Sequence, residues 1–389
     1  MKYRVMAVFG IRPDFIRSSI ILKKLIKHPN IQLDFVYTGQ HYDDELMGVF
    51  FREMNIPPPT IILDTAAPTD VQQHCKLIGE LEKCINIVEP DCVIFLGDAN
   101  AVMGCIAPLK MGIPIIHVEA GMRSHDWEMP EERNRKLIDS VSDVLYCYQN
   151  DYKCKLVQEG ICPTKIVVTG NTIVDVINEH MLEIKRRAPE VLEKYKVKSK
   201  NYAIMTLHRN ENMNREFASR ILLGANQWAS KHNMPIILPV MPRLQKIFNI
   251  NADILNTETL SNYIYTEPLG FFDFVALEMN AAIEFTDSGT NQETSAILDV
   301  PCVVTRRSTE RPETFKSNIT VMDRKEIEKA ADFVYGREKC KDFSLGDGNA
   351  AEIIVNDLVE RLKRGIKNNE VYINNFRLNN WIDNRYGNS

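Results

Sequence analysis

The chain has 389 residues, of which 44% are hydrophobic and 25% charged, values that are ordinary for a globular protein and exclude a disordered or fibrous one. A formal net charge of −5 provides no basic surface for nucleic acid or for an anionic membrane. No apolar run approaches the roughly 18 residues of a membrane-spanning helix. The N-terminus is too short and too strand-like for a secretory signal. We therefore expect a cytoplasmic protein of two domains that binds neither nucleic acid nor membrane.

The nine cysteines form no CxxC pair, and the ligand spacings of a zinc site are missing. Cys84, Cys92, Cys105 and Cys302 fall in apolar stretches, where we expect reduced thiols in a hydrophobic core. The sequence therefore predicts no metal site.

Short apolar runs alternate with longer amphipathic ones along the whole chain. The predicted strands cover residues 3–9, 33–37, 92–96, 113–118, 144–146, 165–168, 202–205, 234–238, 263–265, 281–285, 301–304 and 319–322. Helical patterns, such as those over 15–27 and 215–231, separate most of them. Apolar strands separated by helices indicate parallel sheets covered on both faces.

Two runs of six strands predict an α/β fold with two doubly wound, Rossmann-like domains facing a cleft. We place an N-terminal domain at residues 1–173 and a C-terminal domain at residues 174–364. Residues 365–389 are expected to form an extension that packs on the N-terminal domain.

The residues that follow the strands form the candidate site, because open parallel sheets bind ligands beyond the carboxyl ends of their strands. After the first strand, Gly10 permits a tight turn and Pro13 suits the start of a helix. Arg12 and Arg17 can reach the cleft from this turn. A plain strand–helix turn with two solvated arginines is the alternative.

Acidic residues follow the next strands. Asp98 and Glu119 stand at two strand ends, where a buried carboxylate is costly unless it is paired or used. One such acid could be a helix cap, but two, with His117 near, make that explanation weaker. Glu131 and Arg135 lie in a segment that begins with proline, which is also an ordinary helix start.

The second half contributes His208 and Arg209 after its first strand, a pair suited to an anionic leaving group, although a lone histidine is more often structural. Ser288, Gly289 and Thr290 open a helix whose N-terminus could cradle a diphosphate. The remaining candidates are Glu293, for ribose hydroxyls, and Arg311, for phosphate.

Ten short motifs occur in an order and spacing that resemble one family: GIRPDFIR, TGQHYDDEL, GDAN, HVEAGMRS, PEERNR, TGN, TLHRNEN, PLGFFDF, DSGTNQE and TERPE. Over residues 1–360 the chain resembles the non-hydrolysing UDP-N-acetylglucosamine 2-epimerases and relatives that act on other UDP-2-acetamido sugars. The resemblance implies a glycosyltransferase-B-like fold and a homodimer. It also implies epimerisation at carbon 2, through UDP elimination to a 2-acetamidoglucal and re-addition, without cofactor or metal, for surface polysaccharide precursors.

The resemblance also implies roles for matching residues. Asp98, Glu119 and Glu131 match the carboxylates for proton handling and sugar positioning, and His208 matches the residue that assists the UDP leaving group. Arg12 and Arg135 match the arginines of the cleft. Ser288 and Gly289 match the diphosphate cradle, and Phe272 matches the uracil site.

Several residues depart from the family pattern. Arg17 replaces a lysine, and Thr294 replaces the second of two glutamates, which usually holds the ribose. The segment Gln40–Asp43 departs from the family's effector-site motif, so we expect no activation by UDP-N-acetylglucosamine. These departures favour a 6-deoxy or uronate sugar, with UDP-N-acetylglucosamine as the other candidate. A hydrolysing epimerase, a glycosyltransferase of the same fold and a non-catalytic nucleotide-sugar-binding module are the alternatives.

Overall fold

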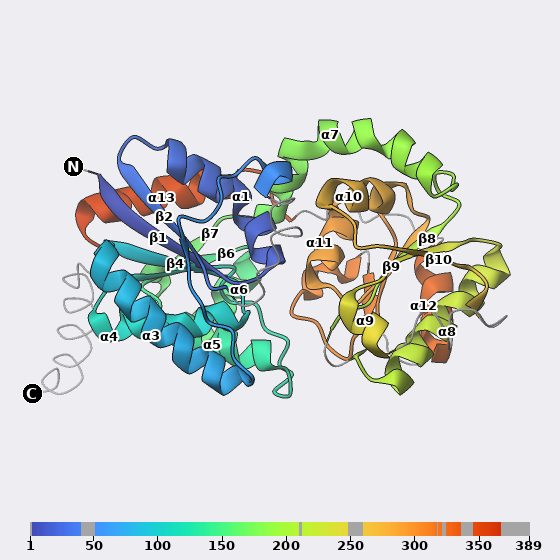
Figure 1. Cartoon of the computed structure of the whole chain (residues 1–389), viewed down its shortest axis with the longest axis horizontal. Helices are drawn as coiled ribbons and strands as arrows, with labels where there is room; N and C mark the ends of the chain where they lie inside the picture. The colour runs from blue at the N-terminus through green and yellow to red at the C-terminus, as the bar shows by residue number, and fades with distance from the viewer. Residues whose placement is uncertain are drawn as a thin grey trace, which may run out of the picture.

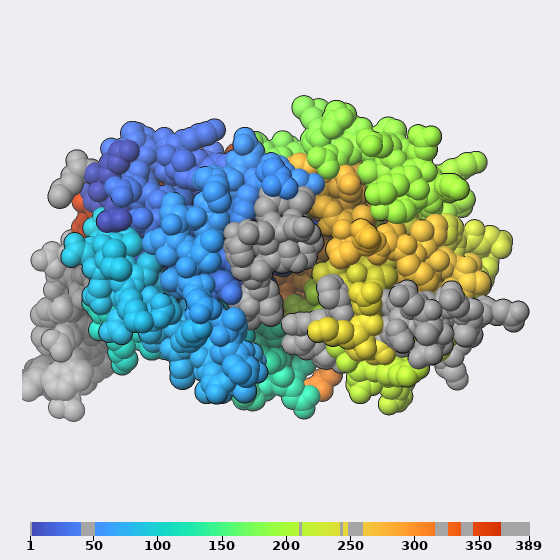
Figure 2. Space-filling view, viewed as in Figure 1, coloured from blue at the N-terminus to red at the C-terminus, as the bar shows by residue number. Residues whose placement is uncertain are grey.

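The computed structural model describes residues 2–39, 51–209, 212–247, 260–316, 318–320, 324–335 and 345–366. They form two units, each built on a parallel sheet, that lie side by side (Figures 1 and 2). Of the helices described, none combines the length and apolar character needed to cross a membrane.

The first unit carries a sheet of seven described strands in the order β3-β2-β1-β4-β5-β6-β7, and every neighbouring pair is parallel. Its strands are β1 (Tyr3–Phe9), β2 (Ile31–Tyr37), β3 (Ile61–Ile62), β4 (Cys92–Leu96), β5 (Ile115–Val118), β6 (Val144–Cys147) and β7 (Ile166–Val168). Between them run α1 (Arg12–Lys27), α3 (Asp70–Val88), η1 (Asn100–Cys105), α4 (Ile106–Met111), α5 (Pro130–Val141), α6 (Asn150–Gln158) and η2 (Pro163–Lys165).

The second unit repeats the pattern with six described parallel strands in the order β10-β9-β8-β11-β12-β13. The strands are β8 (Ala203–Thr206), β9 (Ile236–Pro239), β10 (Tyr263–Thr266), β11 (Ile283–Thr286), β12 (Cys302–Val304) and β13 (Asn318–Thr320). The helices are α8 (Arg215–His232), α9 (Pro242–Ile247), α10 (Phe271–Asn280), α11 (Gly289–Ile297), η5 (Pro312–Lys316) and α12 (Arg324–Tyr335).

The predicted fold class is confirmed, since both sheets are parallel and doubly wound in a glycosyltransferase-B-like arrangement. Central strands such as β4 are buried at every residue, which explains their unbroken apolar sequence. All twelve predicted strands are present, and β3 is added at the edge of the first sheet. With only two residues, β3 is too short to leave a periodic pattern in the sequence.

The four cysteines expected in the core are buried, two of them on the central strands β4 and β12. Burial raises the pKa of the Cys105 thiol to about 12. Such a thiol is protonated and unreactive at neutral pH, which fits a packing role.

Two helices join the units. Helix α7 (Thr172–Lys194) leads from β7 into the second unit and extends along its edge (Figure 1). Helix α13 (Ala350–Arg364) returns to the first unit, where it lies near α1. Asp175 on α7 accepts the amides of Ala350 and Ala351 at 3.2 and 2.8 Å, and so caps α13.

The division of the chain into domains stays a proposal. The tyrosine hydroxyl of Tyr146 on β6 donates to Asp357 of α13 at 2.9 Å, and Leu358 is fully buried in the core of the first unit. These contacts favour a division in which residues 350–364 belong with residues 1–173, although the sequence grouped them with the second domain.

Leu358→Ala tests that division. Loss of a fully buried leucine costs about 2–5 kcal/mol in the free energy of unfolding, and the loss is expected in the transition of the first unit. Ile353→Ala, on the same helix but 36% exposed, is the control and should cost much less. Urea unfolding followed by hydrogen exchange in each unit measures both, and a loss confined to the second unit would contradict the division.

Candidate active site

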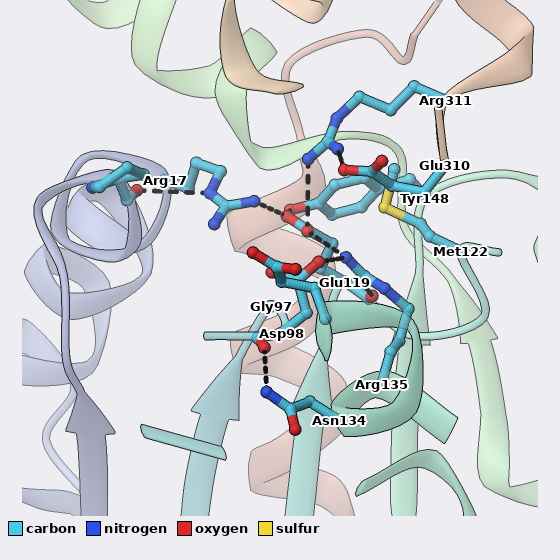
Figure 3. Close-up of polar contacts among 12 residues, drawn as sticks. Arg17, Gly97, Asp98, Glu119, Met122, Asn134, Arg135, Tyr148, Glu310 and Arg311 are labelled. Carbon is cyan, nitrogen blue, oxygen red and sulfur yellow. Dashed lines mark hydrogen bonds and ion pairs between the residues drawn. The ribbon is translucent and has the colours of Figure 1, made fainter. Parts of the chain in front are cut away.

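Glu119 occupies the centre of the site, directly after β5. Its backbone φ of +72° lies in the left-handed region, which is uncommon for a residue other than glycine and is often found at functional sites. The side chain is fully buried among the guanidinium groups of Arg17, Arg135 and Arg311 (Figure 3). Arg17 pairs with Oε2, while Nη2 of Arg135 and Nη2 of Arg311 lie 3.3 and 3.5 Å from Oε1.

These guanidinium groups keep Glu119 ionised. Burial alone would raise the pKa of this carboxyl, but Arg17, Arg311 and Arg135 outweigh it and hold the pKa at about 2. The hydroxyl of Tyr148 donates to Oε2 at 3.2 Å and adds to this stabilisation. At neutral pH, Glu119 is therefore a weak base whose charge organises the arginines around it.

Asp98 stands beside Glu119 at the end of the neighbouring strand β4. Arg135, on α5, bridges the two acids, since its Nη2 also pairs with Asp98. The preceding residue on α5, Asn134, donates its side-chain amide to the Asp98 carbonyl at 3.0 Å. The side chain of Asp98 remains 17% exposed, so it is accessible to a ligand where Glu119 is not.

Glu131 and Arg209 face each other across the boundary between the units. Glu131 lies in the first turn of α5, and its Oε1 is 3.5 Å from Nη1 of Arg209. The Glu131 side chain is 34% exposed. The structure thus brings a third predicted acid to the same boundary, opposite the loop that carries His208.

Asp287 holds that loop in place, a role the sequence reasoning missed. Its buried carboxylate accepts the backbone amides of His208 and Arg209 at 2.9 and 2.8 Å and the side-chain amide of Asn212 at 3.1 Å. Nδ1 of His208 lies 3.2 Å from the same carboxylate. The only sequence signal was the position of Asp287 directly after β11.

The predicted cradle opens α11. Ser288 is the N-cap, with its hydroxyl accepting the amide of Asn291 at 3.4 Å. A Cβ at Gly289 would come within 2.4 Å of Nη1 of Arg311, so glycine is needed for the guanidinium to approach. Thr290 follows in the first turn and is partly buried. Helix N-terminus and guanidinium together form a surface suited to phosphate.

Arg311 connects the cradle to both units. Besides Glu119, it pairs with the neighbouring Glu310 and, through Nε, with Oε1 of Glu293 at 3.0 Å. Glu293 is fully buried and also accepts the side-chain amide of Asn171 at 2.8 Å. Burial, only partly offset by Arg311, raises its pKa to about 7. Thr294 donates its hydroxyl to the buried Glu278 at 2.6 Å.

Two predicted residues lie away from this cluster. Arg12 donates Nη2 to the carbonyl of Leu269 at 2.9 Å, and burial lowers its pKa to about 10. Phe272 is 3% exposed, and its ring packs against two residues of α7. Its ring centroid lies 4.9 Å from that of His180 and 5.0 Å from Cζ of Arg187.

The segment Gln40–Asp43 lies outside the described residues. Within the described part of the chain, no three His, Cys, Asp or Glu side chains gather in a way that could hold a metal ion.

A sequence model of the UDP-N-acetylglucosamine 2-epimerase family matches residues 23–359. The chain belongs to this family. A UDP-N-acetylglucosamine 2-epimerase of Methanococcus maripaludis is 35% identical over 361 residues, which cover 91% of this chain and 98% of that protein. The structure of the Methanocaldococcus jannaschii UDP-GlcNAc 2-epimerase in complex with UDP-GlcNAc and UDP matches with a TM-score of 0.85 and 35% identity, over 92% of this chain and 99% of that one.

One relative acts on a different sugar. The UDP-2,3-diacetamido-2,3-dideoxy-D-glucuronate 2-epimerase of Pseudomonas aeruginosa is 30% identical over 310 residues, which cover 79% of this chain and 84% of that protein. Family membership is therefore compatible with more than one sugar.

Two buried glutamates predict opposite pH dependences of stability. The Glu119 pKa lies below its ordinary 4.5, so this residue stabilises the fold above pH 4.5 and loses that contribution as pH falls toward 2. The Glu293 pKa lies above 4.5, so its contribution is complete below pH 4.5 and is lost as pH rises through about 7.

Glu119→Gln and Glu293→Gln form a matched pair for this test. From pH 5 to 8, wild type should lose stability relative to Glu293→Gln. Below pH 4.5, the stability difference between wild type and Glu119→Gln should shrink, while that between wild type and Glu293→Gln should change little. Denaturant unfolding at each pH measures these differences, and parallel slopes for the two variants would contradict the assignment.

Proposed function

We propose that the protein epimerises carbon 2 of a UDP-2-acetamido sugar through elimination of UDP to a 2-acetamidoglucal and re-addition. One observation carries the proposal beyond family membership. The carboxylate cluster of the first unit contacts the predicted diphosphate cradle of the second unit through an ion pair. Oε1 of Glu119 lies 3.5 Å from Nη2 of Arg311. Elimination needs this arrangement, because loss of a weakly acidic proton must be coupled to the departure of a stabilised diphosphate.

The exposed fractions of the Asp98, Glu131 and Glu119 side chains indicate different roles for these three acids. Asp98 and Glu131 have side chains 17% and 34% exposed, and both stand at the boundary between the units. They handle the proton at carbon 2 on the two faces of the sugar. Glu119 is sequestered by three guanidinium groups, so it organises Arg17, Arg135 and Arg311 and takes no proton from carbon 2.

The second unit holds the leaving group. The N-terminus of α11, opened by Ser288 and Gly289, binds the diphosphate, and the buried guanidinium of Arg311 next to Gly289 adds positive charge there. His208, oriented by Asp287, donates to the departing phosphate oxygen. The carboxylate of Glu293 is used by Asn171 and Arg311, which argues that it fixes Arg311 and does not bind the ribose directly.

The sugar is UDP-N-acetylglucosamine, giving UDP-N-acetylmannosamine, or a 6-deoxy or uronate relative. The uronate relative is supported by the Pseudomonas aeruginosa protein. We further propose a cytoplasmic homodimer that supplies precursors for surface polysaccharide, on the basis of the family resemblance.

A panel of UDP-2-acetamido sugars in deuterated water, followed by NMR, tests the reaction. Deuterium should appear at carbon 2 of a product that is still a UDP-sugar, because elimination removes the proton and re-addition returns one from solvent. Release of free sugar would indicate a hydrolysing epimerase, and an acceptor-dependent product would indicate a glycosyltransferase. Epimerised product without deuterium would exclude exchange with solvent at carbon 2.

Asp98→Asn and Glu131→Gln test the division of roles. Each should lower kcat by about 10²–10⁴-fold, the usual contribution of a general acid or base, while the Kd for UDP changes little. Glu80→Gln, which alters a partly exposed acid of α3 paired with Lys83, is the control. Steady-state kinetics and calorimetry with UDP measure both effects. If Asp98→Asn abolished UDP binding and retained turnover, the assignment would be wrong.

A further inference from the structure

His117 lies on β5, two residues before Glu119, and its side chain is fully buried. Its ring lies between the end of β4 and helix α5. Nε2 is 2.8 Å from the carbonyl oxygen of Gly97, and Nδ1 is 2.6 Å from Oδ1 of Asp139. Both ring nitrogens are therefore engaged within the protein.

The partners of His117 fix its protonation. The carbonyl of Gly97 can only accept a hydrogen bond. Asp139 also only accepts, because its other oxygen takes the amide of Gly121 at 3.1 Å and Nη1 of Arg123 at 2.8 Å. Burial alone would raise the Asp139 pKa, but His117 and Arg123 lower it, which keeps the carboxylate ionised. Two acceptors require a hydrogen on each ring nitrogen, which is the imidazolium form.

The two turns joined in this way carry the acids of the cleft. Gly97 has a φ of +75° and directly precedes Asp98, and its amide donates to the carbonyl of Val118 at 3.1 Å. On the other side, Asp139 holds the amide of Gly121, which closes the turn that begins at Glu119. His117 is the connection between the carbonyl of the first turn and the carboxylate that holds the second.

We propose that His117 is a positioning residue whose imidazolium, held between the Gly97 carbonyl and Asp139, sets the spacing of Asp98 and Glu119 around Arg135. The inference rests on the proposed function, since it concerns the geometry of the same acids. The competing explanation is a buried histidine that contributes stability alone.

His117→Gln separates the two explanations, because glutamine is of similar size but carries both of its N–H groups on one nitrogen, whereas the two partners of His117 face two separate ring nitrogens. We expect kcat to fall by about 10²-fold, as misplacement near 1 Å can produce, with KM and the Kd for UDP within about 2-fold, because the cradle lies in the other unit. His232→Gln is the matched control, since Nδ1 of His232 also donates to a backbone carbonyl, that of Trp228, but His232 lies on α8, away from the acids. Full kcat in folded His117→Gln would overturn the proposal.

A double-mutant cycle with Asp98→Asn supplies a readout that loss of stability does not move. If His117 acts through Asp98, the cost of His117→Gln in kcat should nearly vanish in the Asp98→Asn background. Independent, multiplicative losses would show that His117 does not act through Asp98 and would overturn the proposal.

A third measurement needs no known substrate. In wild-type protein labelled with ¹⁵N-histidine, NMR should show two slowly exchanging ring N–H groups for one buried histidine, identified as His117 by a shift of both signals in Asp139→Asn. A neutral ring with one N–H would overturn the proposal, whether or not His117→Gln folds. If the two N–H groups are present but no UDP-sugar is epimerised, the proposed function fails and the imidazolium clamp stands.

Discussion

The ionic cluster around Glu119 is the interaction on which the rest of the site depends. Three buried guanidinium groups, those of Arg17, Arg135 and Arg311, repel one another and would not be stable together without an anion between them. Glu119 supplies that anion, and its left-handed backbone places the carboxylate where all three converge. Removing one partner would leave buried charge uncompensated, so each member constrains the positions of the others.

The same cluster connects the two units. Arg311 belongs to the second unit and Glu119 to the first, so their pairing is a direct contact between the two units at the site. Away from the acids, a second set of contacts acts in the same direction. Glu53 accepts the amide of Phe271 at 3.0 Å and so caps α10 from the opposite unit, while Arg12 holds the carbonyl of Leu269. The first unit therefore holds the loop before α10 through hydrogen bonds at Leu269 and Phe271. Because Arg12 makes one of these bonds, it lies apart from the carboxylates.

Local pattern was sufficient for the fold and for the edge of the sheets where the site lies. Asp98, Glu119 and Ser288 could be placed because each directly follows a buried parallel strand or opens the next helix, and both features are local in sequence. The partners of these residues could not be placed. Nothing in the sequence relates Arg311 to Glu119, or Asn171 to Glu293, because these pairs join segments more than 100 residues apart. Phe272 shows the same limit, since its burial is due to α7.

Long-range charge also explains why chemically identical residues differ in this site. Glu119 and Glu293 are both fully buried glutamates, and desolvation raises the pKa of each. Three guanidinium groups reverse that effect at Glu119, whereas Glu293 shares Arg311 with Glu119 and gains too little to reverse it. The ionised member of the pair therefore stands on the side of the first unit, next to Asp98, and the readily protonated one stands beneath the cradle. The difference between the two pKa values depends on the contact between the units, because Arg311 pairs with both Glu119 of the first unit and Glu293 of the second.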